Sequence, residues 1–170
     1  SVYDDIEEIK TEALMKHKVI DLDLPIRRVT ISEYEAANKA IKDFIKEARG
    51  DVNFNDRAKM HIHAGTIARY RLQQEKDIHT IELHVVRFGE AAIATNTFEL
   101  FLDYGNRIRA RSKAHQTFLI QLACGSDAYL PTEKAEKGSH YSAYVSSGIT
   151  GHTGGEILVR KTVEEINKMF

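Results

Sequence analysis

Two apolar runs separated by only two residues constrain the fold of this chain more than any other feature. The first run covers residues 80–88 (TIELHVVRF) and the second covers residues 91–95 (AAIAT). Gly89 and Glu90 stand between them, and a glycine in so short a connection suits a tight turn. The pattern predicts an antiparallel β-hairpin, and the polar residues Glu82 and His84 indicate that one of its faces meets water.

The segments after the hairpin alternate between helical and extended patterns. A helix capped by Asn96 or Thr97 is expected first, and it is followed by a buried strand over residues 116–123. A long irregular stretch, residues 124–153, leads to a final amphipathic helix over residues 154–169. The core face of the first helix consists of Phe98, Phe101, Leu102, Gly105 and Ile108.

The N-terminal part of the chain predicts three helices and one extended segment. The first helix is expected over residues 4–18 and the extended segment over residues 22–31, where Pro25 indicates an edge strand or a strand start. Ser32 to Glu35 match a capping box that opens a helix reaching about Arg49. A further helix is expected over residues 56–75.

Strands and helices therefore alternate without the strict order of repeated parallel β-α-β units. This arrangement is typical of a mixed sheet with helices packed on it. We predict an α/β (or α+β) fold, with a mixed β-sheet covered by helices, in a single domain over residues 1–170.

Composition excludes several classes of function. The chain has 24 basic and 25 acidic residues, and it lacks a basic stripe with interleaved aromatic residues, so we expect no nucleic-acid partner. No stretch approaches the roughly 18 apolar residues of a membrane span. Cys124 is the sole cysteine, which excludes an intrachain disulfide, and the apolar residues before it predict a buried, unreactive thiol.

Two junctions combine titratable side chains with irregular backbone. Glu99 follows the hairpin at the expected start of a helix, where free backbone N–H groups favour a carboxylate. Tyr129 lies in the sequence CGSDAYLPT, directly after the buried strand. Ligands of open sheets bind where strands end and helices begin. The alternative interpretations are an ordinary first-turn glutamate and a tyrosine that only fills the core.

The eight histidines invite a search for metal ligands. His61 and His63 have the spacing of two ligands on one face of a strand, but they fall in a predicted helix, where positions i and i+2 point apart. His152 lies in a glycine-rich loop that matches no phosphate-binding motif, so a plain loop residue is predicted. The remaining five (His17, His79, His84, His115 and His140) are isolated in the sequence and receive no role.

The order of motifs over residues 81–170 resembles the back half of the catalytic domain of the neutral, non-lysosomal ceramidases. The resemblance covers about half of the chain. After the apolar strand pair that ends at residues 91–95, the matching segments are 97–100 (TFEL), 105–109 (GNRIR), 117–120 (TFLI), 129–132 (YLPT) and 138–141 (GSHY), followed by a terminal helix.

The resemblance implies a zinc-dependent amide hydrolase acting on N-acyl sphingoid lipids such as ceramide. In that family the zinc is held by two histidines from the front half of the domain, by the motif glutamate and by a tyrosine. The matching positions here are Glu99 and Tyr129, which are thus the candidate metal ligands and catalytic residues. Zinc in such a site lowers the pKa of bound water to about 7 and polarises a carbonyl group.

The chain departs from the family pattern at two places. Thr97 and Phe98 replace a proline and a glycine before Glu99, so the turn that presents this carboxylate must be built differently. Residues 125–127 (GSD) replace an asparagine and a tyrosine, which alters the expected substrate contacts. Asp127 is a candidate for assisting the metal or orienting Tyr129. Two alternatives follow, which are a metal-free binding domain of the same architecture and a metal hydrolase with a non-ceramide substrate.

The resemblance also implies partners. The histidine-bearing front half of the domain does not match any part of this chain, so we expect residues 1–170 to be the C-terminal part of a ceramidase-like hydrolase domain, with the N-terminal half of the same protein as a partner. The substrate would be a small-molecule or lipid amide. The chain alone is predicted to bind zinc weakly and to hydrolyse nothing. An apolar surface left exposed would favour homo-oligomers.

Overall fold

The computed structural model describes residues 6, 9, 11–48 and 54–170, and it is built around a four-stranded sheet with the order β1-β2-β3-β5. The two pairs β1–β2 and β2–β3 are antiparallel, whereas β3 and β5 are parallel. The sheet is mixed and helices pack on it, as the sequence predicted. Its strands are β1 (Met15–Pro25), β2 (Ile78–Phe88), β3 (Ala91–Thr95) and β5 (Gln116–Ile120).

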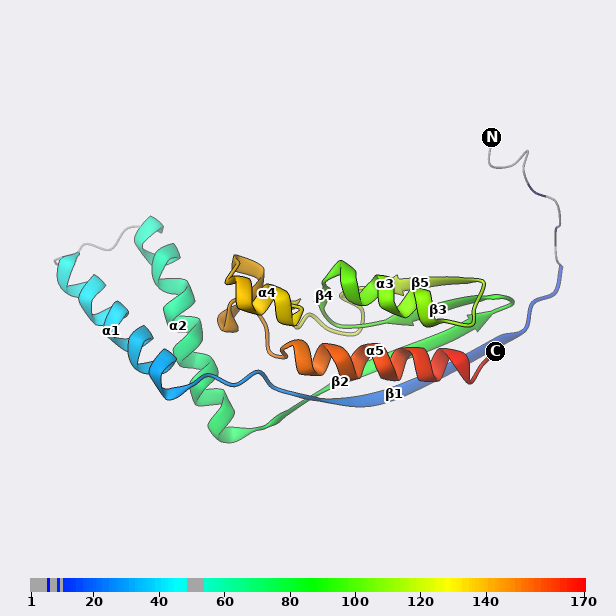
Figure 1. Cartoon of the computed structure of the whole chain (residues 1–170), viewed down its shortest axis with the longest axis horizontal. Coiled ribbons are helices and arrows are strands. Elements are labelled where there is room, and N and C mark those ends of the chain that lie inside the picture. The colour runs from blue at the N-terminus through cyan, green and yellow to red at the C-terminus, as the bar shows by residue number, and fades with distance from the viewer. Residues whose placement is uncertain (1–5, 7–8, 10, 49–53) are drawn as a thin grey trace.

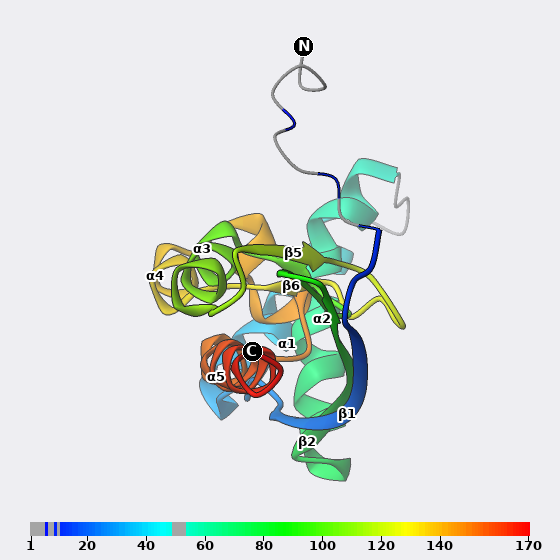
Figure 2. The same cartoon turned by 90° about the vertical axis from the view of Figure 1, so that its right-hand side faces the viewer.

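The predicted hairpin is confirmed as the pair β2–β3. Phe88 pairs with Ala91 across the turn, and Gly89 adopts a φ of +59°, which a glycine reaches without steric cost. The crossover from β3 to the parallel strand β5 runs through the helix α3 (Leu102–Arg111). The last helix, α5 (His152–Asn167), lies with α3 on the same side of the sheet (Figure 2).

One face of the sheet forms the core, because alternate residues of each strand point toward α3 and α5. From β2 these are Ile81, Leu83 and Val85, which are all buried. From α5 they meet Leu158, Val159 and Ile166, which are at most 1% exposed. The sheet residues that alternate with the core positions lie on the opposite face, which we call the open face. Five of its apolar residues are exposed, namely Met15, Val19, Phe88, Phe118 and Ile120.

The helices α1 (Ile31–Glu47) and α2 (Phe54–Glu75) form a pair that extends beyond one end of the sheet (Figure 1). The amide of Gln73 on α2 accepts a hydrogen bond from the backbone N–H of Val29 at 2.7 Å and donates one to the Val29 carbonyl at 2.9 Å. A second α2 side chain, the buried Arg69, donates to the carbonyls of Arg27 and Ile149. These bonds hold α2 against the chain that leaves β1.

Two predictions for the N-terminal part are wrong. The helix expected over residues 4–18 is absent from its described residues, since residues 11–14 are not helical and β1 begins at Met15. Residues 1–5, 7–8 and 10 lie outside the described residues. The helix does not extend to residue 18 because residues 15–18 pair with β2, and these backbone hydrogen bonds favour an extended strand.

The capping residue of α1 also differs from the prediction. Thr30, rather than Ser32, is the N-cap, and its hydroxyl accepts a hydrogen bond from the N–H of Glu33 at 3.2 Å. The Glu33 carboxylate accepts in return from the N–H of Thr30 at 2.7 Å. The sequence contains two overlapping capping boxes, Thr30–Glu33 and Ser32–Glu35, and the earlier one starts the helix.

Among the described residues, no helix combines the length and the apolar composition needed to cross a membrane.

Candidate functional site

The predicted helix start at Asn96 or Thr97 is replaced by a short strand, and this change positions Glu99. Residues Glu99–Leu100 form β4, which pairs in parallel with β6 (Tyr129–Leu130), and α3 begins only at Leu102. The N–H of Glu99 donates to the carbonyl of Ala128 at 2.9 Å. The helical pattern of Phe98, Gly105 and Ile108 misled the prediction, because Phe98 is buried by the strand extension rather than by a helix face.

The pairing of β4 with β6 brings together the two residues singled out in the sequence. Glu99 is the direct partner of Tyr129, and Leu100 is the partner of Leu130. Both leucines are buried in the core, and successive side chains of a strand point to opposite sides. The carboxylate of Glu99 and the phenol of Tyr129 therefore lie on the same side, away from the core. Their role as metal ligands remains a prediction.

The phenol of Tyr129 is held in a small network of oxygen atoms. Its hydroxyl lies 2.7 Å from the hydroxyl of Tyr141, which belongs to the short helix η2 (Tyr141–Ala143), and the two rings meet edge to face at 74°. Hydrogen bonding with Tyr141 and with Glu99 raises the pKa of Tyr129 well above its usual range. Tyr129 is therefore a neutral phenol at neutral pH unless a cation offsets the carboxylate beside it.

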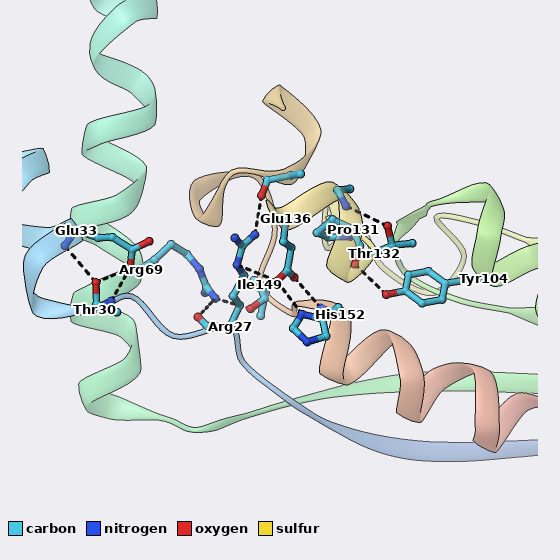
Figure 3. Close-up of polar contacts among 12 residues, drawn as sticks. Arg27, Thr30, Glu33, Arg69, Tyr104, Pro131, Thr132, Glu136, Ile149 and His152 are labelled. Atoms are coloured by element: carbon cyan, nitrogen blue, oxygen red, sulfur yellow. Dashed lines mark hydrogen bonds and ion pairs between the residues drawn. The ribbon is translucent and has the colours of Figure 1, made fainter. Parts of the chain in front are cut away.

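The backbone around Tyr129 is closely packed. Ala128 adopts a φ of +57° and forms a bridge with Gly148, where a Cβ atom would come within 2.2 Å of the Tyr129 carbonyl oxygen. After β6, the hydroxyl of the fully buried Tyr104 donates to the Pro131 carbonyl at 2.9 Å (Figure 3). Strand β6 is thus held from both ends, which fixes the position of Tyr129.

Asp127 has a partner on the sheet. Its Oδ2 atom lies 2.9 Å from Nε2 of His79 on β2, and its N–H donates to the Thr97 carbonyl at 2.8 Å. The backbone hydrogen bond from Asp127 to Thr97 therefore anchors the loop that precedes β6. The suggested roles of assisting the metal or orienting Tyr129 remain predictions, and His79, which sequence analysis left without a role, is the residue that Asp127 contacts.

Three other histidines that the sequence offered as candidates lie on helices. His61 and His63 lie on α2, as predicted. His152 is the first residue of α5, and both its N–H and its Nδ1 atom lie 2.7 Å from the carboxylate of Glu136 on α4 (Glu133–Gly138) (Figure 3). Arg27 also approaches this carboxylate, at 3.8 Å. His152 therefore joins the start of α5 to α4 instead of lying in a free loop.

A second group of metal-binding side chains lies on the open face. Glu82 and His84 stand two residues apart on β2, and the thiol of Cys124 reaches them from the loop after β5. Nε2 of His84 lies 2.7 Å from Oε1 of Glu82 and 3.4 Å from Sγ of Cys124. On the other side of the ring, Nδ1 of His84 lies 2.9 Å from Nε2 of His17 on β1.

The prediction of a buried thiol at Cys124 is wrong. Cys124 is exposed, and it adopts a φ of +61° after the end of β5 at Ile120. The strand is shorter than the predicted range 116–123, and Phe118 and Ile120 are each 46% exposed because they lie on the open face. Sequence reasoning treated the apolar run before Cys124 as buried on both sides, whereas only one of its faces meets the core.

The ionisation of Glu82 and Cys124 depends on the side chains beside them. Hydrogen bonding from His84 and from Cys124 lowers the pKa of the Glu82 carboxyl. Loss of hydration and the adjacent Glu82 carboxylate raise the pKa of the Cys124 thiol, which is therefore protonated at neutral pH. The period-two spacing of Glu82 and His84 could have indicated this group, but the contribution of Cys124, 40 residues further on, required the fold.

Comparisons with known proteins give one partial similarity. No protein-family model matches the sequence, and no curated protein matches it. A solved structure described as "Ceramidase complexed with C2" is similar to 53% of this chain, with 13% sequence identity and a TM-score of 0.47. The similarity covers 15% of that ceramidase chain, so this chain spans only a small part of the ceramidase's length.

Proposed function

We propose that this chain is the C-terminal part of a zinc-dependent amide hydrolase, in which Glu99 and Tyr129 supply two oxygen ligands to the metal. The observation that supports the proposal is the direct pairing of Glu99 with Tyr129 across β4 and β6, with both side chains on the side away from the core. The substrate class is an N-acyl amide of the ceramide type, as the order of motifs over residues 81–170 implies.

The two residues fit a metal as donors, but they do not complete its coordination. Carboxylate oxygens are common zinc ligands, and a phenol can serve once a cation favours its ionised form. Catalytic zinc sites use at least three protein ligands and keep a position open for water or substrate. The remaining ligands would therefore come from the N-terminal half of the same protein. When bound, zinc would lower the pKa of a water molecule and polarise the substrate carbonyl.

The other residues of this region would position the pair. Tyr141 holds the Tyr129 hydroxyl at 2.7 Å, and Tyr104 fixes the end of β6 through the Pro131 carbonyl. The half-exposed apolar residues of the open face, including Phe118 and Ile120, offer a surface for the N-terminal half of the protein. Apolar burial there would hold the N-terminal half against the sheet and so position its metal ligands.

We expect Glu99→Gln to lower the amidase activity of the full-length protein by about 100-fold or more, because loss of even an outer-shell partner of a metal costs 10–100-fold. Tyr129→Phe should act in the same direction, and both variants should contain less zinc. Hydrolysis of a fluorescent N-acyl sphingosine and the zinc content of the purified proteins provide the measurements. Tyr141→Phe should cause a smaller loss, since Tyr141 positions Tyr129 rather than binding the metal.

Glu133→Gln is the matched control, because this glutamate on α4 is exposed and forms an i,i+4 pair with Lys137. It should leave activity and zinc content unchanged. Full activity in Glu99→Gln would refute the proposed ligand. A full-length protein that hydrolyses no amide would favour a metal-free binding domain, and activity on esters or glycosides alone would favour a hydrolase with another substrate.

A further inference from the structure

The open face of the sheet carries a set of donors that the proposed amidase does not use. Glu82, His84 and Cys124 offer one oxygen, one nitrogen and one sulfur atom, and these three atoms all lie within 4.8 Å of one another. They come from β2 and from the loop after β5, which the parallel pairing of β3 with β5 brings over the open face. A thiolate and an imidazole together favour zinc over magnesium or calcium.

We propose that Glu82, His84 and Cys124 form a second, independent zinc site, in which His17 supports His84. Zinc binds sulfur at about 2.3 Å and nitrogen or oxygen at about 2.0–2.2 Å, so tetrahedral geometry separates sulfur from nitrogen by about 3.6 Å and nitrogen from oxygen by about 3.3 Å. The distance from Cys124 Sγ to His84 Nε2 is 3.4 Å, which already suits this arrangement.

The remaining adjustment is small. Oε1 of Glu82 lies 2.7 Å from Nε2 of His84 and would move outward by roughly half an ångström on metal binding. The side chain of Glu82 is 47% exposed, so nothing in the core has to shift with it. Three protein ligands leave the fourth position to water or to a donor from another molecule.

His84 has an outer partner for its second ring nitrogen, although that partner is an imidazole and not the more common carboxylate or backbone carbonyl. Its Nδ1 atom lies 2.9 Å from Nε2 of His17, and its backbone N–H donates to Oγ1 of Thr95 at 3.0 Å. In the metal-bound state the Nδ1–H of His84 donates to His17, which leaves the lone pair of Nε2 for zinc. Metal binding displaces the proton of the Cys124 thiol, because the thiolate is the form that binds zinc.

The test uses cobalt as a spectroscopic substitute for zinc on the metal-free, reduced 170-residue chain. We expect one equivalent of Co²⁺ to produce a near-ultraviolet thiolate-to-cobalt charge-transfer band, which Zn²⁺ then removes by displacement. Cys124→Ser should abolish the band. His84→Asn should weaken binding by more than the 10–100-fold typical of an outer-shell partner, whereas His17→Asn should weaken it by about 10–100-fold and keep the band.

Three controls make the outcome decisive. His115→Asn changes an exposed histidine outside the group and should bind cobalt as the parent chain does. Glu99→Gln and Tyr129→Phe should leave the band unchanged, which separates this site from the proposed amidase. If His84→Asn fails to fold by circular dichroism, the exposed Glu82→Gln variant decides in its place. A parent chain without the thiolate band, or equal affinity in Cys124→Ser, would overturn the proposal.

Discussion

Replacing Gly155 by alanine is expected to lower the free energy of unfolding by about 3 kcal/mol, near the upper end of typical overpacking costs. A Cβ atom at this position of α5 would come within 2.3 Å of both Cζ and the hydroxyl oxygen of Tyr104 on α3. Alanine is the better helix former by about 0.5–1 kcal/mol, but this gain is smaller than the expected cost of the clash.

Tyr104 cannot move aside at low cost. Its side chain is fully buried, and its hydroxyl donates to the Pro131 carbonyl at 2.9 Å. Displacing the ring would break this bond and disturb β6, which carries Tyr129. We therefore expect Gly155→Ala to reduce the activity of the full-length protein as well as its stability.

Urea unfolding followed by circular dichroism measures the effect of Gly155→Ala. Gly138→Ala is the matched control, because Gly138 also lies in a helix and an added Cβ atom there meets nothing within 4 Å. The control should be neutral or slightly stabilising. Similar stability of the two variants would show that α3 and α5 are less closely packed than the structure indicates.

Replacing Glu165 by glutamine is expected to lower the free energy of unfolding by about 2–3 kcal/mol at neutral pH. The carboxylate of Glu165 is only 1% exposed, and it accepts from Lys18, Lys161 and Lys168 at 2.6–2.8 Å. Hydrogen bonds from Lys161, Lys168 and Lys18 lower its pKa to about 2. The expected loss is smaller than the full pKa shift of Glu165 would give, because the three lysines remain partly exposed and solvent screens their charges.

The same group predicts how stability depends on pH. A carboxyl group with a lower pKa in the folded state than in the unfolded state stabilises the fold above its unfolded pKa of about 4.5. This contribution should disappear progressively as the pH falls from about 5 toward 2. Thermal unfolding across this range should show a smaller acid-induced loss in Glu165→Gln than in the parent chain.

Glu164→Gln provides the comparison on the same helix. Glu164 is 45% exposed and also contacts Lys168 and Lys161, so its removal should lower the free energy of unfolding much less than removal of Glu165 does. Equal losses in the two variants would mean that burial of Glu165 adds nothing to its ion pairs. Parallel acid profiles of the parent chain and Glu165→Gln would contradict the depressed pKa.

Sequence patterns predicted the elements whose signal is local. The turn at Gly89, the helix over residues 56–75 and the final helix each depend on a continuous run of residues, and each is present within a few residues of its expected bounds. The patterns failed where pairing partners are distant. The first residues of β1, 15–18, were taken for the end of a helix over residues 4–18, because their strand character depends on pairing with β2, more than 60 residues later.

The candidate sites show the same difference between local sequence signals and distant contacts. Glu99 and Tyr129 were singled out from motif order, and β4 and β6 bring them together through a pairing that spans 30 residues. Cys124 was assigned to the core because an apolar run preceded it, but the run has only one buried face. His84 and His17 were isolated in the sequence and become neighbours across β1 and β2.

By itself, the sequence determined the hairpin and most of the helices, since these follow from short-range periodicity. The two residues on which the proposed amidase depends were singled out by the resemblance in motif order and remain a prediction. Only the tertiary structure decided which face of the sheet is covered and which side chains share a site. The physical reason is that burial and ligand geometry depend on contacts between strands far apart in the chain, and these contacts leave no periodic trace in either strand alone.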